Sequence, residues 1–237
     1  MPPVTFVLLD GMAEATARQC MGFLRALEDA GQARYARLTC ELPPLSRPLY
    51  ATLLSGAAPM THGIVHNADA RPCPLPTIFS RARDAGMATA AAAYHWISEI
   101  CNRAPFDAAR DRLTDDATLP VSHGLFYMSD DYPDEEVFRD AAMLLCRHSP
   151  DLLLIHCMGA DTAGHRHGAG SREYRNAARL ADGLLARHLP GWLLAGRSVL
   201  VTSDHGMDAD GMHNDDVPLP RRQTEVTGLV ARLLHLP

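Results

Sequence analysis

The sequence predicts an α/β fold built around a mostly parallel sheet. Apolar runs of strand length recur along the chain, and helical patterns rich in Ala and Leu separate them. Strands that alternate with helices are typical of parallel sheets. Three of the apolar runs also lead into acidic residues, at Asp10, Asp161 and Asp204. Because the carboxyl ends of parallel strands share one edge of a sheet, we expect these acids to meet at the edge where α/β proteins bind ligands.

Length and composition are those of an ordinary globular domain. The 237 residues are 47 % hydrophobic and 21 % charged, and the net charge is −6 with no basic run. We therefore expect residues 1–237 to form a single domain, with neither nucleic acid nor a membrane as a partner. The six cysteines form no C-x-x-C motif, and the N-terminus lacks a signal-peptide pattern. Reduced thiols and a cytoplasmic location are the resulting predictions.

The first half of the chain is expected to supply two core strands and three helices. Residues 4–9 read as a buried strand that ends at Asp10-Gly11, and residues 13–30 read as one helix. Residues 50–54 predict a short helix after a proline-rich entry, and residues 61–67 predict a loop. A helix over 75–85 leads to a second strand over 87–94. Trp96 follows that strand, where it would either pack or stack on a substrate group.

The second half predicts two further strands and a less regular segment. Residues 102–133 contain acids and turn residues, and they predict a small insertion over the sheet edge. Strands are expected over 151–157 and 199–202, with a glycine-containing loop over 158–168. Helices are expected over 134–148, 171–188 and 224–236.

Ser46 stands just before the predicted helix over 50–54, and two roles are open to it. Its side chain could cap the helix by accepting a backbone N–H. It could instead be a nucleophile, with the helix amides and dipole facing a bound anion.

Carboxylates and imidazoles at the strand ends indicate a metal site. Adjacent residues on a strand point to opposite faces, so Asp204 and His205 can share a metal only where the strand has ended, and Gly206 permits that turn. Such donors suit zinc and similar divalent ions. The candidate ligands are numerous enough for two metals. They are Asp10, Asp161, His165, Asp204, His205 and His213.

Taken together, these motifs resemble the alkaline phosphatase superfamily, and most closely its type I phosphodiesterase/nucleotide pyrophosphatase branch. The resemblance spans residues 10 to 213. It rests on Asp10-Gly11, Ser46-x-Pro-x-x-x-Thr-x-x-Ser-Gly56, Thr61-His62-Gly63-Ile64 with Asn67, Asp161-x-x-Gly164-His165-x-x-Gly168, and Ser203-Asp204-His205-Gly206-Met207.

The resemblance implies a three-layer α/β/α sandwich of the alkaline phosphatase type and a hydrolase of small phosphate esters. It implies two divalent metals, usually zinc, although manganese, magnesium or iron could serve. One metal would be held by Asp161, His165 and His213, for which His167 is the substitute. The other would be held by Asp10, Ser46, Asp204 and His205. Ser46 would form a covalent phospho-enzyme, and Asn67 would bind a phosphoryl oxygen.

The chain also departs from the branch's usual pattern, and several activities stay open. The nucleophile is Ser rather than Thr, His213 follows His205 closely, and the chain is short. Phosphodiesterase activity is favoured by Asn67. Phosphomonoesterase activity would need an extra cation, for which Arg47 and Arg103 are candidates although a surface role is favoured for each.

Three further functions fit the same core. They are hydrolysis of phosphonates, phosphoryl transfer by a phosphomutase, and metal binding without catalysis. Sulfate esters are disfavoured because Ser46 departs from the Cys-x-Pro-x-Arg signature of sulfatases.

Overall fold

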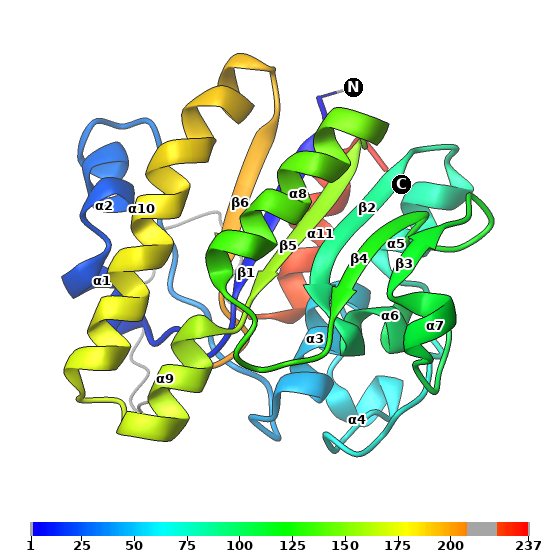
Figure 1. Cartoon of the computed structure of the whole chain (residues 1–237), viewed down its shortest axis with the longest axis horizontal. Coiled ribbons are helices and arrows are strands. Elements are labelled where there is room, and N and C mark those ends of the chain that lie inside the picture. The colour runs from blue at the N-terminus through cyan, green and yellow to red at the C-terminus, as the bar shows by residue number, and fades with distance from the viewer. Residues whose placement is uncertain (1, 208–221, 237) are drawn as a thin grey trace.

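A computed structural model describes residues 2–207 and 222–236. Its centre is a six-stranded sheet in the order β3-β4-β2-β5-β1-β6 (Figure 1). All neighbouring strands are parallel except β3, which runs antiparallel to β4. The strands are β1 (Val4–Leu9), β2 (Thr89–Tyr94), β3 (Leu113–Asp115), β4 (His123–Tyr127), β5 (Leu152–Cys157) and β6 (Ser198–Thr202).

Helices cover both faces of the sheet and complete three layers. One face packs against α1 (Glu14–Cys20), α2 (Gly22–Asp29), α8 (Asp134–His148) and α10 (Arg172–Leu194), which lie in front of or beside the sheet in Figure 1. The other face packs against α3 (Ser46–Ser55), α5 (Ile78–Asp84), α6 (His95–Cys101) and α11 (Thr224–Leu233). The short helices are α4 (Pro59–His62), α7 (Ala108–Asp111) and α9 (Gly159–His167). The predicted three-layer α/β/α fold is confirmed.

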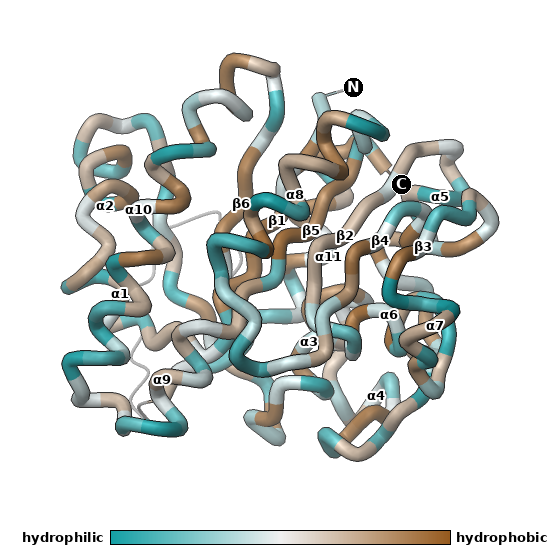
Figure 2. Tube along the Cα trace, in the orientation of Figure 1, coloured by the Kyte–Doolittle hydropathy of each residue, from teal (hydrophilic) through white to brown (hydrophobic). Residues whose placement is uncertain are grey.

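Alternation along the central strands creates the two cores. In β1, Val7 and Leu9 pack against the first face, whereas Phe6 and Leu8 pack against the second. Successive side chains of a strand point to opposite sides, so a strand between two helical layers must be apolar throughout. Figure 2 shows this as hydrophobic colour along β1, β5 and β6. Within the described residues, none of the helices has the length and apolar character needed to cross a membrane.

The segment 102–133 corrects one prediction. It is not an insertion over the sheet edge, because it supplies β3 and β4 to the sheet itself. β4 lies inside the sheet, hydrogen-bonded to β2 on one side and to β3 on the other. Both strands are short and their flanks are rich in acids and turn residues, so the period-two signal in the sequence is weak.

Several helices also differ from the predictions. The helix expected over 13–30 is divided between α1 and α2 at Met21, whose backbone leaves the helical region at φ −96° and ψ 75°. The glycine-containing loop expected over 158–168 is instead helix α9. Helix α10 runs on to Leu194, past Pro190, and so extends beyond the predicted end at residue 188. In each case tertiary packing outweighs local propensity.

Candidate functional site

Asp10 lies at the centre of the carboxyl-end edge, directly after β1. Its backbone N–H donates to the Cys157 carbonyl at 2.9 Å, and the side chain is fully buried. Gly11 then turns the chain with φ +62°, a conformation that favours glycine. A Cβ at Gly11 would lie 2.8 Å from the Cα of Asp161. Glycine therefore lets the start of α9 approach the end of β1.

Asp204 and His205 reach the same point from the end of β6. Asp204 is buried, and its Oδ1 accepts the Gly11 N–H at 3.1 Å. The Nε2 atom of His205 lies 3.5 Å from Asp204 Oδ2 and 3.6 Å from Asp10 Oδ1. The backbone turn after the strand thus brings two adjacent side chains to one centre.

Ser46 faces this centre from the amino end of α3. The helix begins at Ser46 rather than at Tyr50, and the position before the first helical residue belongs to Leu45. The Ser46 hydroxyl therefore does not cap the helix; it lies 3.1 Å from His205 Nε2. Asn67 lies alongside, where its Oδ1 accepts the Arg47 backbone N–H at 3.1 Å. This hydrogen bond uses the amide oxygen, so the Asn67 NH₂ group is the donor that a ligand beside Ser46 would meet.

Helix α9 adds Asp161 and His165. The two residues are one turn apart, and His165 Nε2 lies 3.3 Å from Asp161 Oδ1. The same oxygen lies 3.8 Å from His205 Nε2, so Asp161 joins the group around His205. The His165 side chain is 71 % exposed and stands at the open side of the site.

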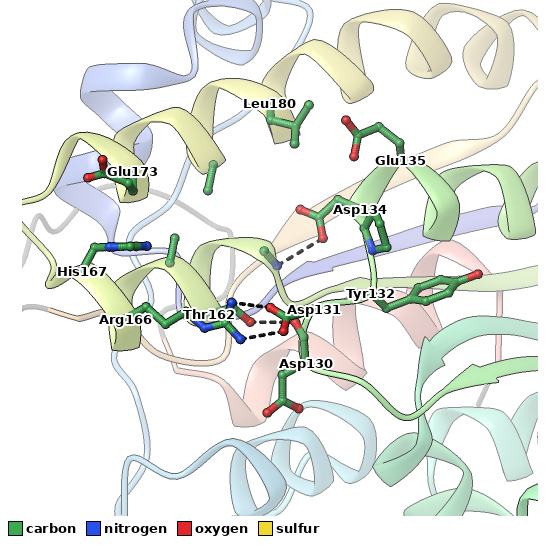
Figure 3. A pocket seen from close by; sticks show the side chains of 14 residues that line it. Asp130, Asp131, Tyr132, Asp134, Glu135, Thr162, Arg166, His167, Glu173 and Leu180 are labelled. Atoms are coloured by element: carbon green, nitrogen blue, oxygen red, sulfur yellow. Dashed lines mark hydrogen bonds and ion pairs between the residues drawn. The ribbon is translucent and has the colours of Figure 1, made fainter.

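The chain before α8 anchors α9 (Figure 3). Thr162 donates to the Asp130 carbonyl at 2.8 Å, and Arg166 forms an ion pair with Asp131 at 2.6 Å. Asp134 accepts the Gly159 N–H at 3.1 Å, which satisfies an amide at the amino end of α9. These contacts hold the helix that carries Asp161, and they line a cavity of about 270 Å³.

Burial and mutual repulsion perturb the acids of the site. Burial, followed by the charge of Asp161, raises the pKa of Asp10 to about 7. Burial, followed by the charge of Asp10, raises the pKa of Asp204 to about 7. Burial also raises the pKa of Asp161. Burial lowers the pKa of His205, but the carboxylates of Asp204, Asp10 and Asp161 outweigh it and raise that pKa overall.

The unpartnered oxygens of these acids fit a bound cation. Asp10 Oδ1, Asp161 Oδ1 and Asp204 Oδ2 are buried and have no hydrogen-bond partner within the described residues. A buried carboxylate oxygen without a donor is unfavourable unless a cation satisfies it. Ligand atoms of Asp10, Asp204 and His205 lie within 4.8 Å of one another. Carboxylate and imidazole donors at this spacing suit a divalent metal such as zinc.

A family model for type I phosphodiesterase/nucleotide pyrophosphatase matches residues 4–217. The chain belongs to this family. The family's usual dependence on metals agrees with the cluster of buried acids. No curated protein matches the sequence.

Solved structures share the fold. Phosphonoacetate hydrolase from Sinorhizobium meliloti 1021 is 23 % identical with a TM-score of 0.60, over 86 % of this chain and 56 % of its own. Murine ectonucleotide pyrophosphatase/phosphodiesterase 5 is 17 % identical with a TM-score of 0.66, over 86 % and 57 %. A 2-O GAG sulfatase is 12 % identical with a TM-score of 0.64, over 100 % and 71 %. The chain thus spans little more than half the length of the first two proteins.

Two predicted ligands remain, His213 and its substitute His167. His213 lies outside the described residues. His167, its predicted substitute, is exposed and lines the cavity of Figure 3 beside Glu173. His167 is six positions after Asp161 on α9, which places the two side chains on different faces of the helix.

Arg47 and Trp96 have structural partners that the sequence did not reveal. Arg47 is buried rather than at the surface, and its Nη1 donates to Glu99 Oε2 at 2.7 Å. Its guanidinium stacks on the Trp96 ring at 4.4 Å, so Trp96 packs within the protein. Arg103 lies near the surface and pairs with Asp111 at 3.5 Å.

Two residues around Asp10 were missed by sequence reasoning. His156 on β5 lies 3.1 Å from Asp10 Oδ2 through its Nε2 atom. Tyr50 on α3 donates its hydroxyl to the same oxygen. The sequence did contain one indication of this contact, because His156 is an imidazole inside an otherwise apolar strand. Tyr50 gave no signal, because its partner is 40 residues away in sequence.

A second group of possible ligands lies at the opposite edge of the sheet. Asp115, His123 and His148 have ligand atoms within 4.8 Å of one another, at the start of β4 and the end of α8. The two imidazoles stack with centroids 3.7 Å apart and an interplanar angle of 14°. In-plane lone pairs of nearly parallel rings do not converge on one point, so this arrangement is a stacked surface pair.

Proposed function

We propose that the chain is a metal-dependent hydrolase of small phosphodiesters or closely related phosphonates, acting through a covalent phospho-Ser46 intermediate. One observation carries the proposal. The Ser46 hydroxyl is not used as a helix cap and lies 3.1 Å from His205 Nε2, beside three buried carboxylates that each keep an oxygen without a partner among the described residues. A hydroxyl held at a helix amino end, next to a cation site, is suited to attack a phosphoryl group.

The ligands divide into two sets. Asp10, Asp204 and His205, with Ser46, would hold one cation. Asp161 and His165 would hold the other, and His213 is the third ligand proposed from the sequence. When bound, the cations would supply Lewis-acid stabilisation of the phosphoryl and leaving oxygens and would favour ionisation of the Ser46 hydroxyl. Zinc is the ion that these donors fit best.

The residues themselves orient and stabilise the reacting group. Ser46 Oγ would form its bond to phosphorus as the bond to the leaving oxygen breaks on the opposite side. The Asn67 NH₂ group would donate to the phosphoryl oxygens as charge builds on them, and the positive end of the α3 dipole would stabilise the same charge. Water would then displace Ser46 Oγ from phosphorus, which releases the product and restores the hydroxyl.

The ion pairs of Arg47 and Arg103 favour diesters over monoesters as substrates. A phosphomonoester carries one more charge than a diester, and a side-chain cation commonly offsets it. Arg47 is buried against Glu99, and Arg103 pairs with Asp111. Of the two cations nominated from the sequence, Arg47 is therefore occupied, and Arg103 lies near the surface beside an acid that Arg110 also pairs with.

Two functions of a different class make distinct predictions. A phosphomutase would transfer the phosphoryl group to a hydroxyl of a second substrate rather than to water. A scaffold without turnover would bind zinc and hydrolyse no ester. Product analysis with and without an acceptor alcohol separates both from a hydrolase.

Sulfate esters are the least favoured substrates. The Cys-x-Pro-x-Arg signature is replaced by Ser46-Arg47-Pro48-Leu49-Tyr50, which lacks both the cysteine and the final arginine. In the structure Tyr50 donates to Asp10, so this position serves the carboxylate rather than a substrate anion.

A panel of four substrates tests the proposal on purified, metal-analysed protein. It compares a bis-aryl phosphate diester, an aryl monoester, an aryl phosphonate and an aryl sulfate at equal concentration. We expect the highest kcat/KM for the diester or the phosphonate and the lowest for the sulfate. Protein that contains zinc but hydrolyses none of the four would contradict the proposal.

Substitution of Asn67 tests the phosphoryl-binding role. We expect Asn67→Ala to lower kcat roughly 10²-fold, which is the usual effect of removing one donor to a developing oxyanion. Asn67→Asp should be at least as damaging, because it replaces the donor by an acceptor with negative charge. Steady-state kinetics on the diester gives the result. A loss confined to KM would instead assign Asn67 to ground-state binding.

Proton release on metal binding tests the ionisation of the ligands. Asp10 and Asp204 have pKa values raised to about 7 in the protein without metal, so below that pH protons compete with the cation. We expect zinc affinity to rise with pH through about 7, because these carboxyl groups and His205 must lose their protons to bind the ion. Calorimetric titrations near pH 6 in buffers of different ionisation enthalpy should show proton release. A binding enthalpy that is independent of the buffer would contradict these assignments.

A further inference from the structure

Asp10 is held by two donors that converge on one of its oxygens. The Tyr50 hydroxyl and His156 Nε2 both reach Oδ2, the latter at 3.1 Å. When Asp10 is ionised it can only accept, so the His156 ring then carries its proton on Nε2. The other oxygen of Asp10 has no hydrogen-bond partner among the described residues and faces His205 Nε2 at 3.6 Å. One oxygen is thereby fixed and the other is presented to the site.

The two donors are rigid and come from both sides of Asp10. His156 is fully buried on β5, where its neighbour in the β1 register is Leu8, two residues before Asp10. Tyr50 is also fully buried, and its ring meets the His156 ring edge-on with centroids 4.7 Å apart. Neither side chain has room to change its rotamer without opening the core, so the direction of the Asp10 carboxylate is determined by its surroundings.

Tyr50 also connects Asp10 to the nucleophile. Tyr50 and Ser46 are four residues apart on α3, so their side chains lie on the same face of the helix, one turn apart. The helix that presents the Ser46 hydroxyl therefore carries the group that fixes Asp10. A shift of α3 would move the nucleophile and release the carboxylate together.

From this geometry we infer that Tyr50 and His156 are positioning residues that set the affinity of the Asp10 cation site. Tyr50 also keeps Ser46, one turn away on α3, at a fixed position relative to that site. The inference rests on the cation site of the proposed function. Both residues act through Asp10 rather than on the substrate. Groups that orient a ligand in this way usually change metal affinity by roughly 10- to 100-fold when they are removed.

Single substitutions that remove one donor each test the inference. Tyr50→Phe keeps the ring and deletes the hydroxyl. His156→Leu deletes the ring N–H, and His156→Gln retains a side-chain N–H near the same position. We expect the first two variants to bind one of two zinc ions roughly 10- to 100-fold more weakly in a chelator competition titration. His156→Gln should recover part of that affinity. Zinc bound as tightly by Tyr50→Phe and His156→Leu as by the unmodified protein would overturn the inference.

Tyr127→Phe is the matched control. Tyr127 is a buried tyrosine whose hydroxyl donates to the His156 carbonyl at 2.7 Å. Of the two tyrosines, Tyr50 is the one whose hydroxyl donates to Asp10. The control loses one buried hydrogen bond but should retain both zinc ions at unchanged affinity. An equal loss of zinc affinity in Tyr127→Phe would overturn the inference, because it would assign the effect to general loosening of the core. Thermal unfolding in EDTA confirms that each variant is folded.

Zinc titration also separates this inference from the proposed function. If no ester is hydrolysed but Tyr50→Phe weakens zinc binding and Tyr127→Phe does not, the inference stands and the hydrolase proposal fails. If esters are hydrolysed and all variants bind zinc equally, the hydrolase proposal stands and the inference fails. An unmodified protein that binds no divalent ion would overturn both.

Discussion

Replacing Ser46 by alanine should reduce kcat by at least about 10³-fold, since loss of a nucleophile leaves only the binding and electrostatic contributions to catalysis. The hydroxyl lies 3.1 Å from His205 Nε2 at the start of α3 and is not needed to cap the helix. The carboxylates and imidazoles around it are untouched, so Ser46→Ala should retain bound zinc. Ser46→Thr should keep measurable activity because it preserves a hydroxyl at the same position.

Ser55→Ala is the matched control at the other end of the same helix. The Ser55 hydroxyl donates to the Ala51 carbonyl within α3 and is remote from the acids. We expect its kcat to stay close to that of the unmodified protein. Turnover by Ser46→Ala at the normal rate, with equal zinc content, would refute the nucleophile assignment.

Replacing Asp204 by asparagine should weaken zinc binding and stabilise the metal-free protein at neutral pH. The amide oxygen of the new side chain would still accept the Gly11 N–H, while its NH₂ group would replace the unpartnered carboxylate oxygen. One buried charge is then removed from a group of three. Unpaired buried charges are strongly unfavourable, so we expect a gain on the order of 1–3 kcal/mol in the free energy of unfolding without metal.

The sign of the pH dependence follows from the raised pKa of Asp204. This pKa is about 7 in the folded protein against an ordinary value of 3.8, so the folded state holds its proton more tightly. Proton binding to Asp204 therefore stabilises the folded protein at low pH. This stabilisation is lost as the pH rises from 3.8, the ordinary pKa, to about 7, the pKa in the folded protein. Asparagine does not titrate, so the advantage of Asp204→Asn should grow between about pH 4 and about pH 7 and then level off. Thermal unfolding in EDTA at several pH values measures this difference.

Asp182→Asn controls for the loss of a buried acid elsewhere. Asp182 is also buried, but it accepts the N–H groups of Phe23 and Leu24 at 2.8 and 3.1 Å at the start of α2. Its charge is favourable there, so the substitution should lower stability slightly without affecting zinc. If Asp204→Asn is as destabilising as Asp182→Asn in the absence of metal, the account of repulsion among the site acids is wrong.

The features that could be predicted from sequence are those with a local signature. Continuous apolar runs marked β1, β5 and β6, and the acids that follow them identified the edge of the sheet. The adjacent Asp204 and His205 indicated a shared metal site, because two adjacent side chains can point to one metal only after the strand has ended. These signals need no knowledge of distant partners.

The features that were missed depend on contacts between distant parts of the chain. Helix α9 contains two glycines and reads as a loop, but Asp134 satisfies an amide at its start and Gly164 lets Met207 pack closely. The burial of Arg47 requires Glu99, which lies 52 residues away. Short strands such as β3 and β4 have too few residues to show a period, and only pairing within the sheet defines them.

The stereochemical course at phosphorus tests the central claim most directly. A diester made chiral at phosphorus with sulfur would be hydrolysed in water enriched in oxygen-18, and the configuration of the product would be determined. Attack by Ser46 followed by attack of water comprises two in-line displacements, each with inversion, so the account predicts net retention. Net inversion would show a single displacement by water and would contradict a phospho-Ser46 intermediate.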